Sequence, residues 1–264
     1  MWCARNGNKG RAGQYFGTDR MFTFTPTTFG DLNAEGYDAT QDPGTTEDSV
    51  ALIAGIAGSG RVLELAIGTG RVALPLAARG IDISGIEGSP AMVDKLREKP
   101  GGADIPVVIG DMADVDIDGT FDHIFLIFNT FFNLPDQEAQ VRCFANVAKR
   151  LAPGGTFLIE AFVPDFSQFS ENQRMKVREM TMDRMRFEGV THDPVRQLLN
   201  FQRVTMSPEG TRMVPLALRY AWPAEMDLMA RLAGLDLAER WGGWHREPFT
   251  AQSALHVSLW RKPG

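Results

Sequence analysis

The 264-residue chain contains only two cysteines and no long hydrophobic run. Cys3 and Cys143 lie far apart, so their spacing predicts neither a disulfide framework nor a metal site, and it fits a reducing compartment. No apolar run approaches the roughly eighteen residues of a membrane span. The first residues also lack the apolar core of a secretory signal. These shortages predict a cytoplasmic protein with no metal and no membrane partner.

Positive charge is also scarce. The chain carries 27 Lys and Arg against 33 Asp and Glu, which gives a net charge of −6. Its sharpest basic cluster is Lys9 to Arg11, whereas nucleic-acid-binding proteins normally present a broad basic face. The composition therefore argues against nucleic-acid and ribosome substrates. With 44% hydrophobic residues the chain can bury one large core, which favours one elaborated domain over two.

A glycine turn after an apolar segment is the most informative feature that the chain does contain. Residues 61–71 predict a buried strand, a tight turn at Gly68 and Gly70, and the start of a helix. The third glycine of the dinucleotide fingerprint is absent, because residues 72–74 are Val-Ala-Leu. Glu64, just before the turn, would repel a pyrophosphate but would suit an ammonium group. The turn therefore favours a nucleoside ligand without phosphates, and a strand–turn–helix without any ligand is the plain alternative.

A second apolar segment, residues 81–87, ends in a carboxylate. Glu87 would lie at the carboxyl end of its strand, where open α/β sheets bind ligands, and could accept hydrogen bonds from both ribose hydroxyls. Ser89 is predicted to cap the next helix, with Pro90 as its first residue and Met92 on its apolar face. A solvated acid at a strand end is the alternative interpretation of Glu87.

Two further strands are predicted at residues 106–111 and 121–128. The first ends in Asp111, which can accept a hydrogen bond from an adenine amino group, followed by Met112, which can pack on the ring. The second is nearly all apolar, as is typical of a central parallel strand. It leads into Asn129, a polar residue at the mouth of the predicted cleft.

As a set, these motifs resemble those of the class I S-adenosylmethionine-dependent methyltransferases. The matching segments cover about half of the chain: residues 64–70, Glu87, residues 110–112, the strand from Phe121, and Leu-Ala-Pro-Gly-Gly at 151–155. The resemblance implies a Rossmann-like α/β fold, with an open seven-stranded, mostly parallel sheet, helices on both faces and an antiparallel last strand. The chain departs from the family at Ala66, where glycine is common, and at Glu64, where aspartate is usual.

The resemblance implies S-adenosylmethionine as cofactor and S-adenosylhomocysteine as product. No metal is expected, because the sequence shows no acidic metal cluster. In related small-molecule methyltransferases a tyrosine in a Tyr-Asp pair closes over the methionine end of the cofactor, and Tyr37 occupies that position here. Tyr37 precedes a helix that Thr45 or Thr46 is predicted to cap. The positions assigned to the cofactor are Tyr37, Glu64, Ala66, Gly68, Gly70, Arg71, Glu87, Gly88, Met92, Asp111, Met112, Phe128 and Asn129.

The chain is predicted to divide into a lead-in and lid, a methyltransferase core in two pieces, and an insertion between those pieces. The lead-in covers residues 1–45, the core covers residues 46–163 and 223–264, and the insertion covers residues 164–222. Within the core, helices are expected at residues 135–150 and 224–234, and strands at 156–163, 235–241 and 255–260.

The insertion alternates polar and apolar residues in three runs, at 175–190, 197–206 and 213–220. This alternation predicts a three-stranded antiparallel addition. The addition could cap the cleft and form a small-molecule pocket, pair with its copy in a homo-oligomer, or only stabilise the fold.

Methyl transfer from a sulfonium is an in-line displacement that needs alignment and exclusion of water. A neutral amine needs little proton help, whereas a hydroxyl needs a base, for which His192 and His245 are the candidates. His123 and His256 are predicted to be structural, inside strands. The candidate catalytic and substrate-shaping residues are Tyr15, Tyr37, Phe131, His192 and His245, with Phe132, Tyr220 and Trp244 as further aromatic candidates.

The whole-chain pattern resembles small-molecule methyltransferases of the actinobacterial type. That resemblance implies N-methylation of an amine, an amino sugar or similar acceptor, in antibiotic or other secondary metabolism. An O-methyltransferase that uses His192 or His245 as base is the near alternative, and a non-catalytic S-adenosylmethionine-binding or scaffold protein is another. A nicotinamide oxidoreductase is disfavoured, because no Tyr-x-x-x-Lys pair is visible.

Overall fold

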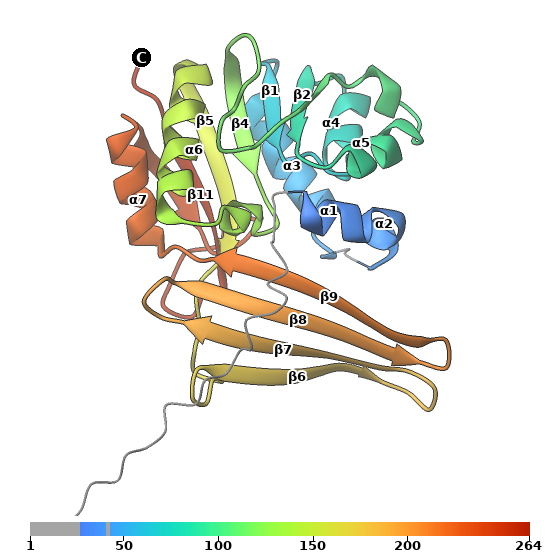
Figure 1. The fold of residues 1–264 in the computed structure, drawn as a ribbon. Coiled ribbons are helices and arrows are strands. Elements are labelled where there is room, and N and C mark those ends of the chain that lie inside the picture. Colours follow the sequence, from blue (N-terminus) through green and yellow to red (C-terminus); the bar gives the residue numbers. More distant parts are fainter. Residues whose placement is uncertain (1–26, 41–42) are drawn as a thin grey trace, which may run out of the picture.

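The computed structural model describes residues 27–40 and 43–264, which form two separate sheets (Figure 1). The larger sheet has the strand order β10-β11-β5-β4-β1-β2-β3, and only β11 runs against the others. This arrangement confirms the seven-stranded, mostly parallel sheet with an antiparallel last strand. Its strands are β1 (Val62–Leu65), β2 (Ile83–Glu87), β3 (Val107–Ile109), β4 (Phe121–Leu126), β5 (Leu151–Phe162), β10 (Asp236–Trp241) and β11 (Leu255–Arg261).

Helices cover both faces of this sheet, because its central strands are apolar on both sides. In β5, Phe157 and Ile159 face a core shared with α6 and α7, whereas Leu158 faces a second core shared with α3 and α4. No helix in the described part of the chain is long and apolar enough to cross a membrane. The α-helices are α1 (Thr28–Asn33), α2 (Tyr37–Thr40), α3 (Thr46–Ala57), α4 (Ala73–Ala78), α5 (Pro90–Arg97), α6 (Gln137–Arg150) and α7 (Pro223–Leu232).

Local signals fix several of these boundaries. The Ser89 hydroxyl accepts a hydrogen bond from the Met92 amide, so the predicted cap of α5 is confirmed. Helix α3 begins at Thr46, but Thr45 makes no side-chain cap bond, so the predicted threonine cap is wrong in that respect. The strand predicted to reach residue 128 ends at Leu126, because the chain then turns into a left-handed conformation.

The insertion forms a four-stranded antiparallel sheet, not the predicted three-stranded one. The run at residues 175–190 is broken by a turn in which the Thr181 amide donates to the Arg184 carbonyl (2.8 Å) and the Thr181 hydroxyl contacts Asp183 (2.9 Å). Figure 1 shows this sheet extending away from the seven-stranded sheet, with β9 nearest to it. The strands are β6 (Gln173–Met180), β7 (Met185–Asp193), β8 (Leu198–Ser207) and β9 (Gly210–Arg219).

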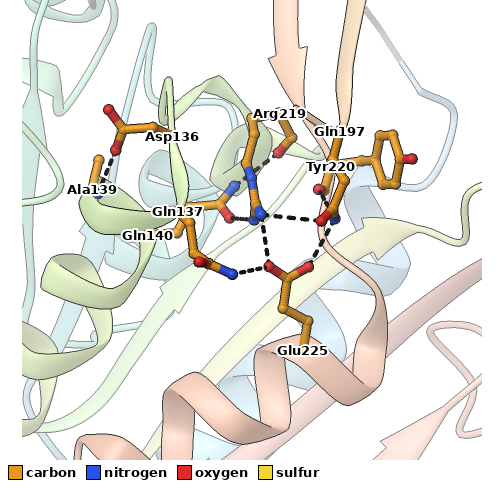
Figure 2. Close-up of polar contacts among 8 residues, drawn as sticks. All are labelled: Asp136, Gln137, Ala139, Gln140, Gln197, Arg219, Tyr220 and Glu225. Atoms are coloured by element: carbon orange, nitrogen blue, oxygen red, sulfur yellow. Dashed lines mark hydrogen bonds and ion pairs between the residues drawn. The ribbon is translucent and has the colours of Figure 1, made fainter. Parts of the chain in front are cut away.

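A polar network joins the antiparallel sheet to α6 and α7 (Figure 2). Arg219, at the end of β9, is 5% exposed and donates to Glu225 on α7 (2.7 Å). The same guanidinium donates to the side-chain oxygen of Gln140 on α6, whose amide nitrogen donates back to the Arg219 carbonyl (2.8 Å). Gln197 and Gln137 donate to the two carboxylate oxygens of Glu225 (2.8 and 2.7 Å). The network pairs the buried charge of Arg219 with the half-buried charge of Glu225 and fixes where β9 leaves the core.

His123 and His256 are buried in strands, as predicted. The His123 ring is 1% exposed and its Nδ1 lies 2.8 Å from the Thr156 hydroxyl. The His256 ring is fully buried and its Nδ1 lies 2.8 Å from the Ser258 hydroxyl. Cys143 is a buried free thiol on α6, which also agrees with the prediction.

The buried His123 predicts a loss of stability in acid. Burial lowers the pKa of His123 to about 4, whereas in the unfolded chain it returns to an ordinary value near 6.5. The unfolded state therefore binds more protons, and stability falls as the pH drops below about 6.5. Between pH 7 and pH 5 we expect the wild type to lose about 2 kcal/mol relative to His123→Gln. Urea denaturation at both pH values measures this difference, and parallel pH profiles of the two proteins would contradict it.

Candidate functional site

The turn after β1 has an unusual backbone that faces the end of β2. Ala66, Gly68 and Gly70 all have positive φ values, of 56°, 58° and 78°. A Cβ on Gly70 would come within 2.3 Å of the Leu96 side chain, so this position requires glycine. Ala66 adopts the left-handed conformation despite its side chain, which costs about 1 kcal/mol. The turn therefore adopts this left-handed conformation with alanine at position 66.

Glu87 holds this turn in place from the neighbouring strand. One carboxylate oxygen accepts a hydrogen bond from the Gly68 amide (2.8 Å), and the other accepts one from the Ser89 amide (2.9 Å). The side chain is buried, and burial raises the pKa of Glu87 while the backbone amides lower it. Each carboxylate oxygen can accept a further hydrogen bond. The arrangement can therefore receive a pair of ribose hydroxyls.

A cavity of about 110 Å³ lies along these strand ends. Asp111 and Met112 close it where β3 ends, and Asp111 is held by a hydrogen bond from the Ala113 amide (2.8 Å). This is where the sequence predicts the adenine. The predicted cofactor residues that line the cavity are Tyr37, Ala66, Gly68, Glu87, Gly88, Met92, Asp111 and Met112.

A smaller cavity shares Tyr37 with this one and is also lined by Glu64, Arg71 and Phe128. Glu64 is 5% exposed, and its Oε2 atom is buried without a hydrogen-bond partner among the described residues. Burial raises the pKa of Glu64 well above its usual range, while the Arg71 guanidinium lowers it. A buried carboxylate oxygen with spare capacity suits the ammonium group of S-adenosylmethionine. The residues present therefore fit that cofactor at both its ribose and its methionine end.

Contacts between the N-terminal helices and the core hold Tyr37 over this junction. Asp38, the next residue, accepts a hydrogen bond from the Thr69 hydroxyl (2.6 Å) and pairs with Lys99 (2.6 Å). Arg71 lies 3.9 Å from the centre of the Phe128 ring and donates to the Tyr37 hydroxyl (3.4 Å). Burial raises the pKa of Tyr37, so the phenol stays protonated at neutral pH. The Tyr37 side chain is thus an oriented hydroxyl at the methionine end of the cavity.

A second cavity, of about 840 Å³, opens from this junction toward the antiparallel sheet. Three residues, Tyr37, Arg71 and Phe128, line both this second cavity and the smaller cavity around Glu64. Residues from β6, β7, β8 and β9 form much of the remaining wall. We name it the acceptor cavity, because a molecule bound there would lie next to the site predicted for the methionine end of the cofactor.

Two predicted cofactor residues have other surroundings. Gly70 packs against Leu74 and Leu96 and does not line these cavities. Asn129 lines the acceptor cavity, but its side-chain oxygen accepts a hydrogen bond from the Phe162 amide (2.6 Å), so it braces β5.

Sequence reasoning missed a second brace, Glu160. Its carboxylate accepts a hydrogen bond from the Phe128 amide (2.6 Å), which supports the left-handed backbone that turns Phe128 toward the cavities. Burial raises the pKa of Glu160 to about 7. A lone acid within the apolar strand 156–162 is the signal that could have revealed it.

The two histidines predicted as bases do not line the acceptor cavity. His192 lies within β7, not after a strand as predicted, and it stacks on Phe166 with ring centres 4.1 Å apart. Its Nε2 lies 3.1 Å from the Tyr220 hydroxyl, and burial lowers its pKa. His245 is on the surface, with its side chain 71% exposed and 3.5 Å from Asp48.

The aromatic candidates are also placed differently from the prediction. Phe131 and Phe132 are fully buried because the turn at Thr130–Asn133 directs them into the core, where Phe131 packs edge-on against Phe144 (5.4 Å). Trp244 and Tyr220 are buried as well. The aromatic side chains that line the acceptor cavity are Tyr37, Phe128, Phe162, Phe166, Phe169 and Phe201.

Tyr15 lies outside the described residues. Within residues 27–40 and 43–264, no group of three His, Cys, Asp or Glu side chains is positioned to hold a metal ion.

Comparison with known proteins identifies the family. Residues 62–155 match the model of the methyltransferase domain. The chain is 31% identical over 196 residues to the cypemycin N-terminal methyltransferase of a Streptomyces species, an alignment that covers 73% of this chain and 79% of that protein.

Solved structures show the same relationship. The CcbJ methyltransferase of Streptomyces caelestis is 36% identical, with a TM-score of 0.86 over 91% of this chain and all of that one. S-adenosylmethionine-bound CalS10 from Micromonospora echinaspora, an amino pentose methyltransferase, shares the fold at 19% identity, with a TM-score of 0.64 over 92% of this chain and 99% of that one. The chain belongs to the class I S-adenosylmethionine-dependent methyltransferases.

Proposed function

We propose that this methyltransferase methylates the amine nitrogen of a small molecule in secondary metabolism, such as antibiotic biosynthesis. The observation that carries the proposal is the 31% identity over 73% of the chain to an enzyme named for methylating the N-terminus of cypemycin. The size of the acceptor cavity, about 840 Å³, suits an acceptor of drug-like dimensions. Amino sugars and other small amines are therefore the first acceptors to screen.

The positions of the histidines support an amine over a hydroxyl. His192 is held between Phe166 and Tyr220, and His245 is at the surface beside Asp48. A hydroxyl acceptor needs a base within hydrogen-bond reach of its proton, whereas an amine that arrives neutral carries a lone pair ready for attack. O-methylation with either histidine as base is therefore the weaker candidate.

Catalysis on an amine would depend on alignment. S-adenosylmethionine, when bound, supplies a methyl group on a positively charged sulfur. Glu64 would hold the ammonium group and Glu87 the ribose, which fixes the cofactor at two points. Tyr37 and Phe128 line both cavities, and they would exclude water and orient the amine. The proton released by the amine can pass to solvent without a dedicated base.

The pH dependence of the rate tests this proposal. We expect kcat/KM for a series of amines to rise with pH up to the pKa of each free amine, because only the neutral amine attacks. His192→Gln and His245→Gln should leave that profile unchanged. A common pKa near 6 to 7 for every acceptor, removed by either substitution, would instead assign a histidine base and favour O-methylation.

Tyr37→Phe should lower turnover more than stability. The substitution removes the hydroxyl that Arg71 contacts and keeps the ring. We expect kcat to fall about tenfold, because the loss of one positioning hydrogen bond at the junction corresponds to roughly 1.4 kcal/mol. The melting temperature should stay within about 2 °C of the wild type. Tyr220→Phe is the matched control, because its hydroxyl contacts His192 away from the acceptor cavity. A melting temperature that collapses together with activity would make Tyr37 structural.

A further inference from the structure

The antiparallel sheet forms one wall of the acceptor cavity. This wall contains three arginines around one buried glutamate. The Glu188 side chain on β7 is 4% exposed. Its Oε1 lies 2.7 Å from Arg178 and 3.7 Å from Arg174, both on β6, and its Oε2 lies 3.2 Å from Arg203 on β8. All four side chains line the acceptor cavity. We name these four residues the arginine cluster.

Strand pairing explains why these charges meet. Glu188 is directly opposite Arg203 in the β7–β8 register, and directly opposite residues in adjacent strands share a face of the sheet. One row nearer the core on the same face, Arg174 pairs with Val190, Val190 with Phe201, and Phe201 with Leu216. This inner row is therefore apolar on β7, β8 and β9, and Arg174 adds a positive charge to it on the edge strand β6.

The arginine cluster has more positive than negative charge. Its three guanidiniums face one carboxylate, and the other charged side chains that line the cavity, Arg71 and Asp165, balance each other. The charged side chains that line the cavity therefore leave a net charge of +2, which lies on this wall.

This surplus is local. Residues 164–222 contain nine Lys and Arg against seven Asp and Glu, a net charge of +2, although the whole chain carries −6. Positive charge also continues beyond the cavity, because Arg203 lines an adjoining groove together with Arg184, Arg186 and Arg212, against one carboxylate, Glu209. Such a basic strip inside an acidic protein attracts anions and repels free cations.

We propose that the acceptor carries an anionic group, a carboxylate or a phosphate, which binds between Arg174, Arg178 and Arg203 while its amine faces Tyr37 and Phe128. The guanidinium fork matches the geometry of both anions, and the ion pairs to Glu188 hold the arginines in position before the acceptor arrives. Apolar side chains, among them Phe201 and Leu216, line the cavity between the two ends. The acceptor is therefore an amine and an acid at once, separated by an apolar or sugar-like middle. This inference rests on the proposed N-methylation only for the amine end.

Anion binding can be measured without knowing the acceptor. The protein, saturated with S-adenosylhomocysteine, is titrated calorimetrically with inorganic phosphate and, separately, with succinate. We expect binding of at least one of them, about tenfold weaker in Arg178→Gln and less weakened in Arg178→Lys, which keeps the charge. Arg178 is 47% exposed, so its replacement should not unfold the chain. Arg231→Gln, an exposed arginine on α7, is the matched control and should bind as the wild type does. Binding of neither anion, or binding that is equal in Arg178→Gln, would overturn the proposal.

Paired acceptors then separate the two anion classes. Each pair shares an amine: a dipeptide and its C-terminal amide, or an amino sugar and its phosphate ester. One of these pairs carries the acid that matches the natural acceptor. In that pair we expect the charged member to have a KM about tenfold lower than the uncharged member, with a similar kcat. Arg178→Gln should abolish this difference in KM. Equal KM values within every pair that is methylated would contradict the anionic acceptor. Arginine-dependent anion binding without methylation of any amine would instead contradict N-methylation and leave the anion site standing.

Discussion

Glu87→Ala is expected to weaken S-adenosylmethionine binding about 100-fold. Hydrogen bonds to a buried charged group contribute roughly 1.5 to 3 kcal/mol each, and Glu87 can offer two to the ribose. The substitution also removes the acceptor of the Gly68 amide, which donates to Glu87 in the wild type, and so loosens the turn predicted to bind the cofactor. Calorimetric titration with S-adenosylmethionine and S-adenosylhomocysteine measures the change.

The fold should change little in the same variant. Burial raises the pKa of Glu87, so the folded state already carries the cost of a buried carboxylate, and its removal offsets the lost backbone contacts. Glu98→Ala, at the end of α5, is the matched control, because its side chain is 62% exposed and pairs only with Lys95 in the described chain. An affinity for S-adenosylmethionine within threefold of the wild type in Glu87→Ala would place the ribose elsewhere.

Arg219→Met is expected to destabilise the protein by about 3 kcal/mol. Removal of one partner of a buried ion pair leaves the other charge uncompensated, which costs roughly 3 to 5 kcal/mol when the pair is fully buried. The Arg219 and Glu225 side chains are 6% and 17% exposed, and Gln197 and Gln137 still donate to Glu225 in the variant, so the lower end applies. The Gln140 side-chain oxygen also loses the hydrogen bond from Arg219 that Figure 2 shows.

An exposed ion pair between α6 and the loop that precedes β4 gives the matched control. Arg142 and Asp114 are 2.9 Å apart, but their side chains are 48% and 55% exposed, so Arg142→Met should cost at most about 0.5 kcal/mol. Urea denaturation followed by circular dichroism compares the two variants. Equal losses would show that the network at the end of β9 contributes no more than a surface ion pair. A larger loss of stability in Arg219→Met than in Arg142→Met would show that this network stabilises the contact between the antiparallel sheet and the core.

Most of the seven-stranded sheet could be predicted because its strands carry local signals. Apolar runs ended in a glycine turn at Gly68, in Glu87 and in Asp111, and each end lies at the same edge of the sheet. The number of strands in the insertion could not be predicted, because the alternation continues through residues 181–184 without glycine or proline. That turn is closed by the Thr181 side chain, a contact that periodicity does not reveal.

The acceptor side of the site depended on contacts between distant segments. Sequence reasoning placed Phe131 there, but the left-handed backbone at Phe128 and Asn129 exposes Phe128 to the cavities and buries Phe131. This backbone is braced by Glu160, which is 32 residues away from Phe128 in the chain. The arginine cluster likewise needs the register of β6, β7 and β8, which the sequence does not specify.

The central claim is that the methyl group goes to nitrogen, and amino alcohols test it most directly. Acceptors that offer an amine and a hydroxyl in one molecule are incubated with the protein and S-adenosylmethionine, and fragmentation mass spectrometry identifies the methylated atom. The account predicts an N-methyl product together with S-adenosylhomocysteine. An O-methyl product would contradict it and favour O-methylation with a general base. S-adenosylmethionine bound without turnover of any acceptor would indicate a binding or scaffold protein.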